Sequence, residues 1–392
     1  MAKPKRNKME FELSFDPVEH QSDQFTSGQL GALVDVYTQG NFPNLSEADV
    51  VIFSVVENRG LDSEIEKLDF NDIRFQLFSL FQGENRLRIA DLGDLKLGAS
   101  PHDTYQLLAD VLQECNERGL LALFIGGSQD CTIGQYRSFV QTKQFCNMVS
   151  IDSRFDLGIN EQSVNSRSYL SHIFNHQPNV LFNFSNLGYQ SYLVSRPEVE
   201  LLNKLFFDAH RLGEIRSNLE EVEPVLRDAN FISIDLNAIK MSDSPAVVDG
   251  SPNGLSSDEI CQLMRYSALG HKLQSLAIYN FNGVRDINNQ TSKLIAQMVW
   301  CFFEGYFHKM RNITANDENL VKYHVSMHDG EYNTCFYKNK HNDKWWMEIP
   351  ILSDSNLNLS PNCFVPCSYK DYLLASNGDV PERWWKAFQK VN

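Results

Sequence analysis

The feature that most constrains this chain is a series of short apolar segments, each of which ends in polar residues. The segments span 49–60, 87–95, 120–130, 147–158, 180–190, 230–240 and 274–283. Apolar runs of this length, bounded by Gly, Asn or Asp, are typical of buried β-strands. Stretches with apolar residues at helical spacing lie between them, for example 103–119 and 256–270. Strands that alternate with helices predict an α/β fold, in which a mainly parallel sheet lies between two layers of helices.

Two segments at the ends of the chain depart from this pattern. Residues 1–45 have no regular periodicity, so we predict an irregular N-terminal tail before an α/β domain at 46–311. Residues 312–392 show weak helical periodicity and many aromatic and turn residues. We predict that they form a C-terminal extension, packed on the main domain through the tryptophans at 345, 346, 384 and 385. Within it, 332–350 resembles a hairpin with a polar turn, and Pro381 is placed to begin a last helix.

Charge and cysteine usage limit the partners and the compartment. Lys plus Arg is 35 and Asp plus Glu is 50, which gives a net charge of −15. Such a field repels polyanions, so we expect neither nucleic-acid nor membrane binding, and no apolar run approaches the ~18 residues of a membrane span. The basic start MAKPKRNKM has no apolar region and does not resemble a secretion signal. The 8 cysteines include several in apolar stretches, which predicts free thiols and a cytoplasmic protein.

Polar residues at the ends of the predicted strands mark the candidate site. In parallel α/β sheets, ligands bind outside the carboxyl ends of the strands. This rule selects four short segments: 128–130, 152–156, 235–237 and 280–282. Aspartate and asparagine dominate them, so the predicted site is rich in oxygen donors.

Three of these segments resemble the signature motifs of the ureohydrolases, the superfamily of arginase, agmatinase and formimidoylglutamase. GGSQD at 126–130 resembles GGDHS, DSRFD at 152–156 resembles DAHxD, and SIDLNAIK at 233–240 resembles SxDxDxxD. The motifs occur in the family's order, and DSRFDLG and LGYQSYL look most similar to the formimidoylglutamase branch. The resemblance implies a three-layer arginase-like fold. It also implies hydrolysis of a C–N bond in a linear amidine or guanidine by a hydroxide held between two Mn²⁺ ions.

The resemblance also implies a metal site with two His and four Asp ligands, of which this chain keeps half. Asp152, Asp156 and Asp235 match family aspartates. The other three ligand positions are changed: Gln129 and Arg154 replace histidines, and Asn237 replaces an aspartate. Lys240 replaces a further aspartate of the family motif, outside these six ligands. Two further positions carry the family's catalytic histidine and a substrate-orienting glutamate, and here they correspond to Arg167 and Asn280.

These losses fall unequally on the two metal positions. Gln129 and the three aspartates could still hold one Mn²⁺, Mg²⁺ or Ca²⁺, because amide and carboxylate oxygens suit hard cations. The other position gains Arg154, whose guanidinium cannot ligate a metal. We therefore expect Arg154 to fill that position and to fork onto the carboxylates. We predict no bound cofactor, with one divalent cation as the alternative. The three aspartates and Arg154 leave an excess of negative charge, which is costly to bury. The cation, a proton shared by two aspartates, or Lys240 could offset this charge.

The degenerate motifs predict a pseudoenzyme that has a binding or scaffold role. One alternative is a hydrolase that acts on a linear amidine or guanidine through a single metal ion. Another is a metal-free pocket for a small cationic ligand, and the carboxylates could also simply hold loops together. The sequence does not identify a protein partner, although the resemblance implies that the chain forms a homo-oligomer.

Two other groups of residues allow a functional reading. Cys363 and Cys367, with Cys335 and His341, have a spacing that fits no familiar closed zinc site, so we interpret them as free thiols. Three aspartates near the third motif could line a pocket or serve as turn and cap residues: Asp243, Asp249 and Asp258.

Overall fold

The computed structural model describes residues 11–392, apart from 62–69, 85, 159–162, 310–316 and 352–361. The main domain is built on a 10-stranded sheet in the order β1-β4-β3-β5-β10-β9-β6-β7-β8, with β2 paired to β4. The strands are β1 (Phe15–Asp16), β2 (Asp35–Val36), β3 (Val50–Val55), β4 (Ile89–Leu95), β5 (Leu121–Ile125), β6 (Cys146–Ile151), β7 (Leu181–Tyr189), β8 (Asp208–Arg211), β9 (Phe231–Asp235) and β10 (Ser275–Tyr279). All described pairs are parallel except β1 with β4. The seven predicted strands are confirmed.

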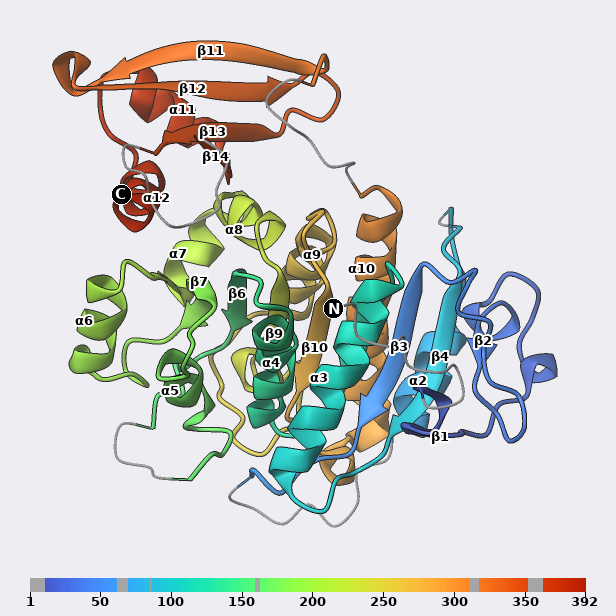
Figure 1. Cartoon of the computed structure of the whole chain (residues 1–392). Coiled ribbons are helices and arrows are strands. Elements are labelled where there is room, and N and C mark those ends of the chain that lie inside the picture. Colours follow the sequence, from blue (N-terminus) through green and yellow to red (C-terminus); the bar gives the residue numbers. More distant parts are fainter. Residues whose placement is uncertain (1–10, 62–69, 85, 159–162, 310–316, 352–361) are drawn as a thin grey trace, which may run out of the picture.

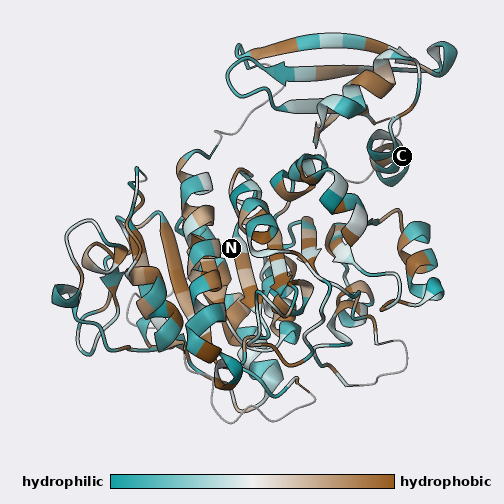
Figure 2. Cartoon of the chain, turned by 180° about the vertical axis from the view of Figure 1, so that it is seen from behind, coloured by the Kyte–Doolittle hydropathy of each residue, from teal (hydrophilic) through white to brown (hydrophobic). Residues whose placement is uncertain are grey.

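Helices cover both faces of this sheet, which confirms the predicted three-layer α/β fold (Figure 1). One layer holds α3 (Pro101–Glu117), α4 (Thr132–Thr142) and α5 (Tyr169–Phe174). The other holds α2 (Asn71–Phe78), α8 (Glu223–Arg227), α9 (Ser257–Ser267) and α10 (Gln290–Phe307). Figure 2 shows the central strands as a largely hydrophobic band between these layers. The strands are buried on both faces, so they read as continuous apolar runs.

The helices begin where the sequence places capping residues. Ser100 and Ser256 each form a capping box, with Asp103 before α3 and Glu259 before α9. Such caps satisfy backbone N–H groups that the first helical turn leaves without partners. Two further helices, α6 (Arg196–Lys204) and α7 (Leu212–Ser217), lie near the β8 edge of the sheet.

The N-terminal segment is more regular than the predicted tail. Strands β1 and β2 both pair with β4, and Phe11 and Phe15 are 1% exposed within the main hydrophobic core. Two-residue strands carry no periodicity, which is why the pattern of 1–45 did not reveal them. Residues 1–10 of the predicted tail lie outside the described residues.

A second, smaller unit follows, which we call the C-terminal module (residues 317–392, as far as described). It is an antiparallel sheet in the order β11-β12-β13-β14, with two helices. Its elements are β11 (Leu320–Met327), β12 (Tyr332–Asn339), β13 (Trp345–Pro350), β14 (Asn362–Cys367), α11 (Tyr369–Ser376) and α12 (Glu382–Val391). The predicted hairpin and the last helix after Pro381 are confirmed. The predicted boundary at 311/312 falls in 310–316, outside the described residues.

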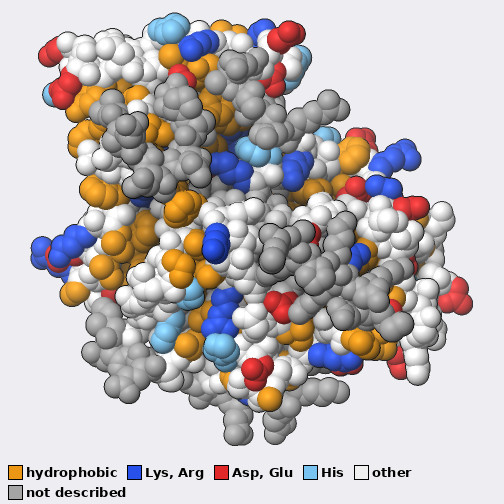
Figure 3. Space-filling view, in the orientation of Figure 1, with side chains coloured by type: hydrophobic (Ala, Val, Ile, Leu, Met, Phe, Trp, Pro, Cys, Tyr) orange, Lys and Arg blue, Asp and Glu red, His pale blue; other side chains and the backbone are white. Residues whose placement is uncertain are grey.

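The consecutive tryptophans of β13 hold the module together and attach it. Side chains alternate between the faces of a strand. Trp345 stacks on Tyr372 at 4.6 Å inside the module, whereas Trp346 faces the main domain, where the Arg227 guanidinium lies 4.4 Å from its ring. Arg227 precedes β9, so the module sits at the amino ends of the main strands, on the side away from the predicted site (Figure 1). Figure 3 shows hydrophobic side chains gathered along this junction.

Among the described helices, none has the length and apolar character that a membrane crossing requires. All eight cysteines are free thiols, as predicted.

Candidate functional site

The candidate site lies at the carboxyl ends of four adjacent strands. Strands β5, β10, β9 and β6 are neighbours at the centre of the sheet, and the chain leaves them at Gly126, Asn280, Asp235 and Asp152. After β5, Gly126 has φ 102° and Gly127 has φ 78°, values that L side chains rarely adopt. This turn brings Gln129 back over the sheet edge. The four segments selected from the sequence therefore meet at one place.

Three buried aspartates form the centre of this site, and we call Asp152, Asp156 and Asp235 the carboxylate triad. One carboxylate oxygen from each lies within 4.8 Å of the others. The three residues are 1%, 6% and 4% exposed. Asp156 has φ 50°, in the left-handed region that Asp tolerates better than most residues. The triad is thus held away from water on a specific backbone path.

Neutral donors hold two of the three carboxylates in place. Asp152 accepts hydrogen bonds from the backbone N–H of Arg154 and from the side-chain amide of Gln129, both at 2.9 Å. Asp235 accepts the backbone N–H of Asn237 at 2.8 Å and its side-chain amide at 2.9 Å. These donors fix the carboxylates but do not cancel their charge.

Burial and mutual repulsion raise the pKa of each triad carboxyl. Burial raises the pKa of Asp152 well above its usual range, and the charges of Asp156 and Asp235 raise it further. Burial raises the pKa of Asp156 to about 7, although the nearby Arg167 guanidinium opposes the shift. Burial also raises the pKa of Asp235, while its hydrogen bonds from Asn237 and Asn280 lower it. Without a cation, the site therefore favours protonation of part of the triad.

The prediction that Arg154 forks onto the carboxylates is wrong. Its guanidinium donates to the Leu193 carbonyl at 3.2 Å and lies 3.5 Å from Asp249. Arg167 is the arginine that approaches the triad, with Nη1 3.7 Å from Asp156 Oδ1, and its other end also contacts Asp249. Asp249 therefore draws both guanidinium groups toward the mouth of the site and away from its centre.

Two other predicted residues take different roles. Lys240 does not compensate the triad, since its Nζ pairs with Asp243 at 3.4 Å. Asn280 does lie at the site, with φ 66°, and its side-chain oxygen accepts the backbone N–H of Gln129 at 3.2 Å. It orients the turn that carries Gln129 and does not present a carboxylate to a substrate.

Some residues at the site were not found by sequence reasoning. The amide nitrogen of Gln129 also lies 3.1 Å from the Tyr169 hydroxyl and 3.4 Å from the Ser233 hydroxyl. Asn186 donates to the Arg154 carbonyl at 2.9 Å and so supports the loop after β6. Of these residues, Ser233 could have been found from the sequence, because it is the first residue of the third motif. Tyr169 and Asn186 have no comparable signature.

A polar cavity of about 260 Å³ adjoins the triad. Its lining includes Asp156 from the triad, both arginines at the mouth, and Glu198 at the start of α6. Asp156 is the triad member that lines the cavity, so a small ion or molecule in it would lie against that carboxylate.

The donor set fits one hard divalent cation. Two buried oxygens, Gln129 Oε1 and Asp156 Oδ1, accept no hydrogen bond from any residue that the structure describes. Buried oxygens without donors are costly, and a cation would satisfy them. Within the described chain, the triad is also the one cluster of three or more His, Cys, Asp or Glu arranged to hold a metal. The expectation of a site without a cofactor therefore finds no support, and a divalent cation is compatible with the residues present.

The donor set does not fit a second ion. The amide of Asn237 is committed to Asp235, where a further carboxylate would be needed. The Arg167 guanidinium, 3.7 Å from Asp156, adds a fixed positive charge beside the triad.

Comparison with known proteins identifies the relatives of this fold. A family model described as "Arginase family" matches residues 65–304. The formimidoylglutamase of Photorhabdus laumondii is 21% identical over 263 residues, which cover 63% of this chain and 80% of that protein. The Bacillus subtilis formimidoylglutamase is 21% identical over 229 residues, which cover 55% of this chain and 71% of that protein.

Solved structures agree with this relationship at the level of the fold. The Trypanosoma cruzi formiminoglutamase solved with Mn²⁺ has a TM-score of 0.62 and 17% identity, and covers 68% of this chain and 96% of its own. The formimidoylglutamase of Bacillus subtilis has a TM-score of 0.63 and 16% identity, and covers 72% of this chain and 92% of its own.

Proposed function

Because this chain belongs to the arginase family, we propose that its carboxylate triad is a metal site reduced to one divalent cation. We further propose that the chain has lost the two-metal hydrolysis for which the family is known and acts as a binding or scaffold protein. The observation that carries this proposal is the triad itself: three buried carboxylates lie within 4.8 Å of one another, with no fourth carboxylate, histidine or cysteine beside them among the described residues.

The charge at the site supports a single cation. The triad carries three negative charges when ionised, and Arg167 supplies one positive charge 3.7 Å from Asp156. One divalent cation brings the local sum to zero, whereas a second would leave two positive charges buried, which is costly. Mn²⁺, Mg²⁺ and Ca²⁺ are the cations whose preferred ligands are oxygens of this kind.

The residues around the triad also support loss of the family reaction. A bound cation acts as a Lewis acid and can activate water. Proton transfer to a leaving group still needs a titratable partner beside the reacting atoms. The triad carboxylates would be occupied as ligands of the cation. The side chains at the family's other functional positions are Arg154, Arg167, Asn237 and Asn280, and none of these exchanges a proton near neutral pH. The site therefore supports binding better than turnover.

Metal loading tests the proposal directly. After incubation with excess Mn²⁺ and gel filtration, we expect one manganese ion per chain by elemental analysis. Asp152→Asn and Asp235→Asn should each abolish retention, because each removes a charged oxygen ligand. Asp258→Asn is the matched control, since Asp258 is an exposed cap residue in the same region that contacts Ser256, and it should retain the ion.

Activity measurements complete the test. The loaded protein should release neither formamide from formiminoglutamate nor urea from arginine or agmatine. Retention of two ions per chain would overturn the one-ion site. Turnover with a single ion would instead establish the single-metal hydrolase, and turnover lost in Asp235→Asn but kept in Asp258→Asn would place that reaction at the triad.

Arg167 should weaken cation binding at the triad. Its charge competes with a divalent ion for Asp156, so Arg167→Met should tighten Mn²⁺ binding by at least about tenfold. Arg154→Met is the matched control: its guanidinium acts less strongly on Asp156 than that of Arg167, so its effect should be smaller. Titration calorimetry with Mn²⁺ measures both variants. Equal effects of the two substitutions, or weaker binding in Arg167→Met, would contradict the placement of Arg167.

A further inference from the structure

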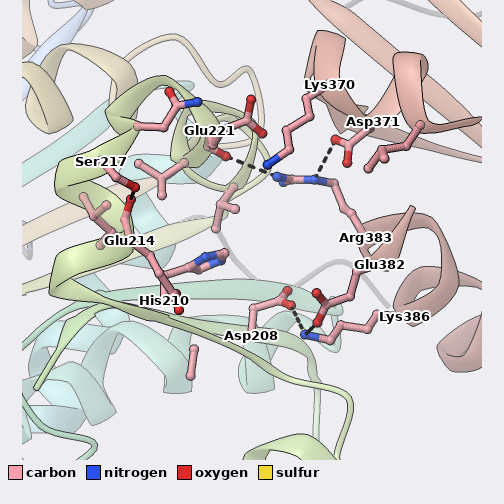
Figure 4. Close-up of a pocket in the computed structure, with 16 residues that line it drawn as sticks. Asp208, His210, Glu214, Ser217, Glu221, Lys370, Asp371, Glu382, Arg383 and Lys386 are labelled. Atoms are coloured by element: carbon pink, nitrogen blue, oxygen red, sulfur yellow. Dashed lines mark hydrogen bonds and ion pairs between the residues drawn. The ribbon is translucent and has the colours of Figure 1, made fainter. Parts of the chain in front are cut away.

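A cavity of about 510 Å³ lies between the main domain and the C-terminal module (Figure 4). Strand β8 and helix α7 form one wall, and helices α11 and α12 form the other. This volume falls within the range of small-molecule sites, which is roughly 300–1,000 Å³. Such sites occur preferentially where two structural units meet. The cavity is separate from the triad in two directions. Across the sheet, β7 lies between β8 and β6, and along the strands the cavity lies near the amino ends whereas the triad lies at the carboxyl ends.

Ion pairs across the cavity brace its two walls. Lys386 on α12 contacts Asp208 at the start of β8 at 2.9 Å and Glu382 at 2.8 Å. Arg383 donates to Asp371 and to the Glu221 carbonyl, both at 3.2 Å. The Lys386–Asp208 ion pair and the Arg383–Glu221 hydrogen bond link the module to the main domain, whereas the other two contacts lie within the module.

Three polar side chains in the cavity have capacity for a further contact. Lys370 and the Glu221 carboxylate form no ion pair with the residues that the structure describes. The Nε2 atom of His210 is buried and has no hydrogen-bond partner there. Burial lowers the pKa of His210, so its ring is neutral and can donate or accept one hydrogen bond. In Figure 4 the Lys370 side chain runs toward the Arg383 guanidinium, and the His210 ring points into the cavity.

We propose that this cavity binds a small zwitterion of the amino-acid type. Its carboxylate would lie between Lys370 and Arg383, with His210 as a further donor, and its ammonium group would pair with Glu221. Arg383 is already paired with Asp371, and Lys370 adds a second positive charge beside it without an ion pair of its own, which favours an anionic group there. The Glu221 carboxylate forms no ion pair in contact, although its charge acts on Arg383, so it can accept a cationic group.

The charge of the whole lining favours a zwitterion over a simple anion. Five carboxylates and three cationic side chains line the cavity, which gives 3 − 5 = −2 with His210 neutral. The cavity therefore disfavours a phosphate dianion overall. A molecule with no net charge avoids this penalty and can still contact both Lys370 and Glu221.

Titration calorimetry on the full chain tests the proposal. With divalent ions removed by chelation, L-glutamate, L-arginine, L-leucine and glycine are titrated separately, and we expect saturable binding of at least one. Acetate and methylammonium each carry half of the zwitterion and should bind at least about tenfold more weakly than that amino acid. Lys370→Ala and Glu221→Gln should each weaken binding at least about tenfold, through loss of one charge contact.

Matched controls separate a specific site from a general charge effect. Glu220→Gln alters the exposed neighbour of Glu221, and Lys204→Ala removes an exposed lysine on α6; both should leave affinity unchanged. The variants are checked for an unchanged unfolding temperature and for normal Mn²⁺ retention at the triad. Absence of heat with all four amino acids would overturn the proposal, as would inorganic phosphate binding as tightly as any amino acid. Full affinity in both Lys370→Ala and Glu221→Gln would place binding elsewhere and also overturn it.

Discussion

With divalent ions chelated, the protein should lose stability as the pH rises from about 5 to about 8. The pKa of Asp156 is about 7 in the folded chain, against 3.8 for an unperturbed Asp. Between these values the folded state binds more protons than the unfolded state, so the free energy of unfolding falls as the pH rises. The contribution of Asp156 is fully present below about pH 4 and is lost above about pH 7, on the order of 4 kcal/mol in all. Burial also raises the pKa of Asp152, so its contribution to the free energy of unfolding changes with pH in the same direction.

Urea denaturation in EDTA over this pH range measures the effect, and Asp156→Asn isolates it. The variant should be more stable than the parent at about pH 8, because it removes one of three crowded charges, and its pH dependence should be flatter. Asp258→Asn should follow the parent. His271 contributes with the opposite sign, since burial lowers its pKa to about 4, so the comparison between variants is the decisive one. The free energy of unfolding of the parent could instead stay constant with pH, or rise toward pH 8 as in Asp156→Asn. Either result would contradict the claim that repulsion among the triad carboxylates destabilises the protein at high pH.

Arg227→Met should release the C-terminal module from the main domain. Arg227 is 3% exposed, pairs with Glu223 at 2.9 Å and donates to the Trp345 carbonyl at 3.0 Å. It also covers the Trp346 ring at 4.4 Å. Without the guanidinium, the buried Glu223 carboxylate keeps one ion-pair partner, Lys344, whose Nζ lies 3.3 Å from Glu223 Oε1. Breaking a buried ion pair on one side typically costs about 3–5 kcal/mol.

Hydrogen exchange followed by mass spectrometry shows which of the two units is destabilised in Arg227→Met. Peptides from β13 and β14 should lose protection in Arg227→Met, while peptides from β5 and β9 keep it. Arg265→Met is the control: Arg265 lies 3.7 Å from Glu304 in an ion pair that is largely exposed, and such pairs contribute less than about 1 kcal/mol. Uniform loss of protection across both units would show instead that the module and the main domain unfold as one body.

The central strands could be predicted because burial on both faces makes their sequences continuously apolar. Strand β8 reads Asp-Ala-His-Arg and lies at the end of the sheet order, where half-exposed polar residues are tolerated, so hydrophobicity did not reveal it. The two tryptophans of β13 were predicted to pack on the main domain. In the structure Trp345 lies in the module core and Trp346 contacts Arg227, because successive side chains of a strand point to opposite faces. Which tryptophan faces which way depends on the strand register, which the sequence does not fix.

At the candidate site, the positions of backbone segments were more predictable than the directions of long side chains. Motif order and strand ends placed the triad correctly. Arg154 and Arg167 both lie near the triad, and several rotatable bonds separate each guanidinium from its backbone. Both guanidinium groups contact Asp249, but only that of Arg167 also reaches Asp156, and backbone position alone does not predict this difference. Tyr169 reaches the site from the start of α5, two residues after Arg167, but it lies outside the three quoted motifs and its contact with Gln129 has no signature in the sequence.

The outer position of β11 has a consequence for self-association. Among the described strands, β11 pairs with β12 alone, so one side of its backbone offers unpaired amide and carbonyl groups to any extended peptide. Natural edge strands are guarded by charged residues, and Lys322 stands exposed near the middle of β11, with its Nζ 5.3 Å from the Tyr337 ring. Replacement of this lysine by a β-branched apolar residue would leave an unprotected apolar edge strand. At high concentration we expect such a variant to form oligomers by addition of strands at this edge.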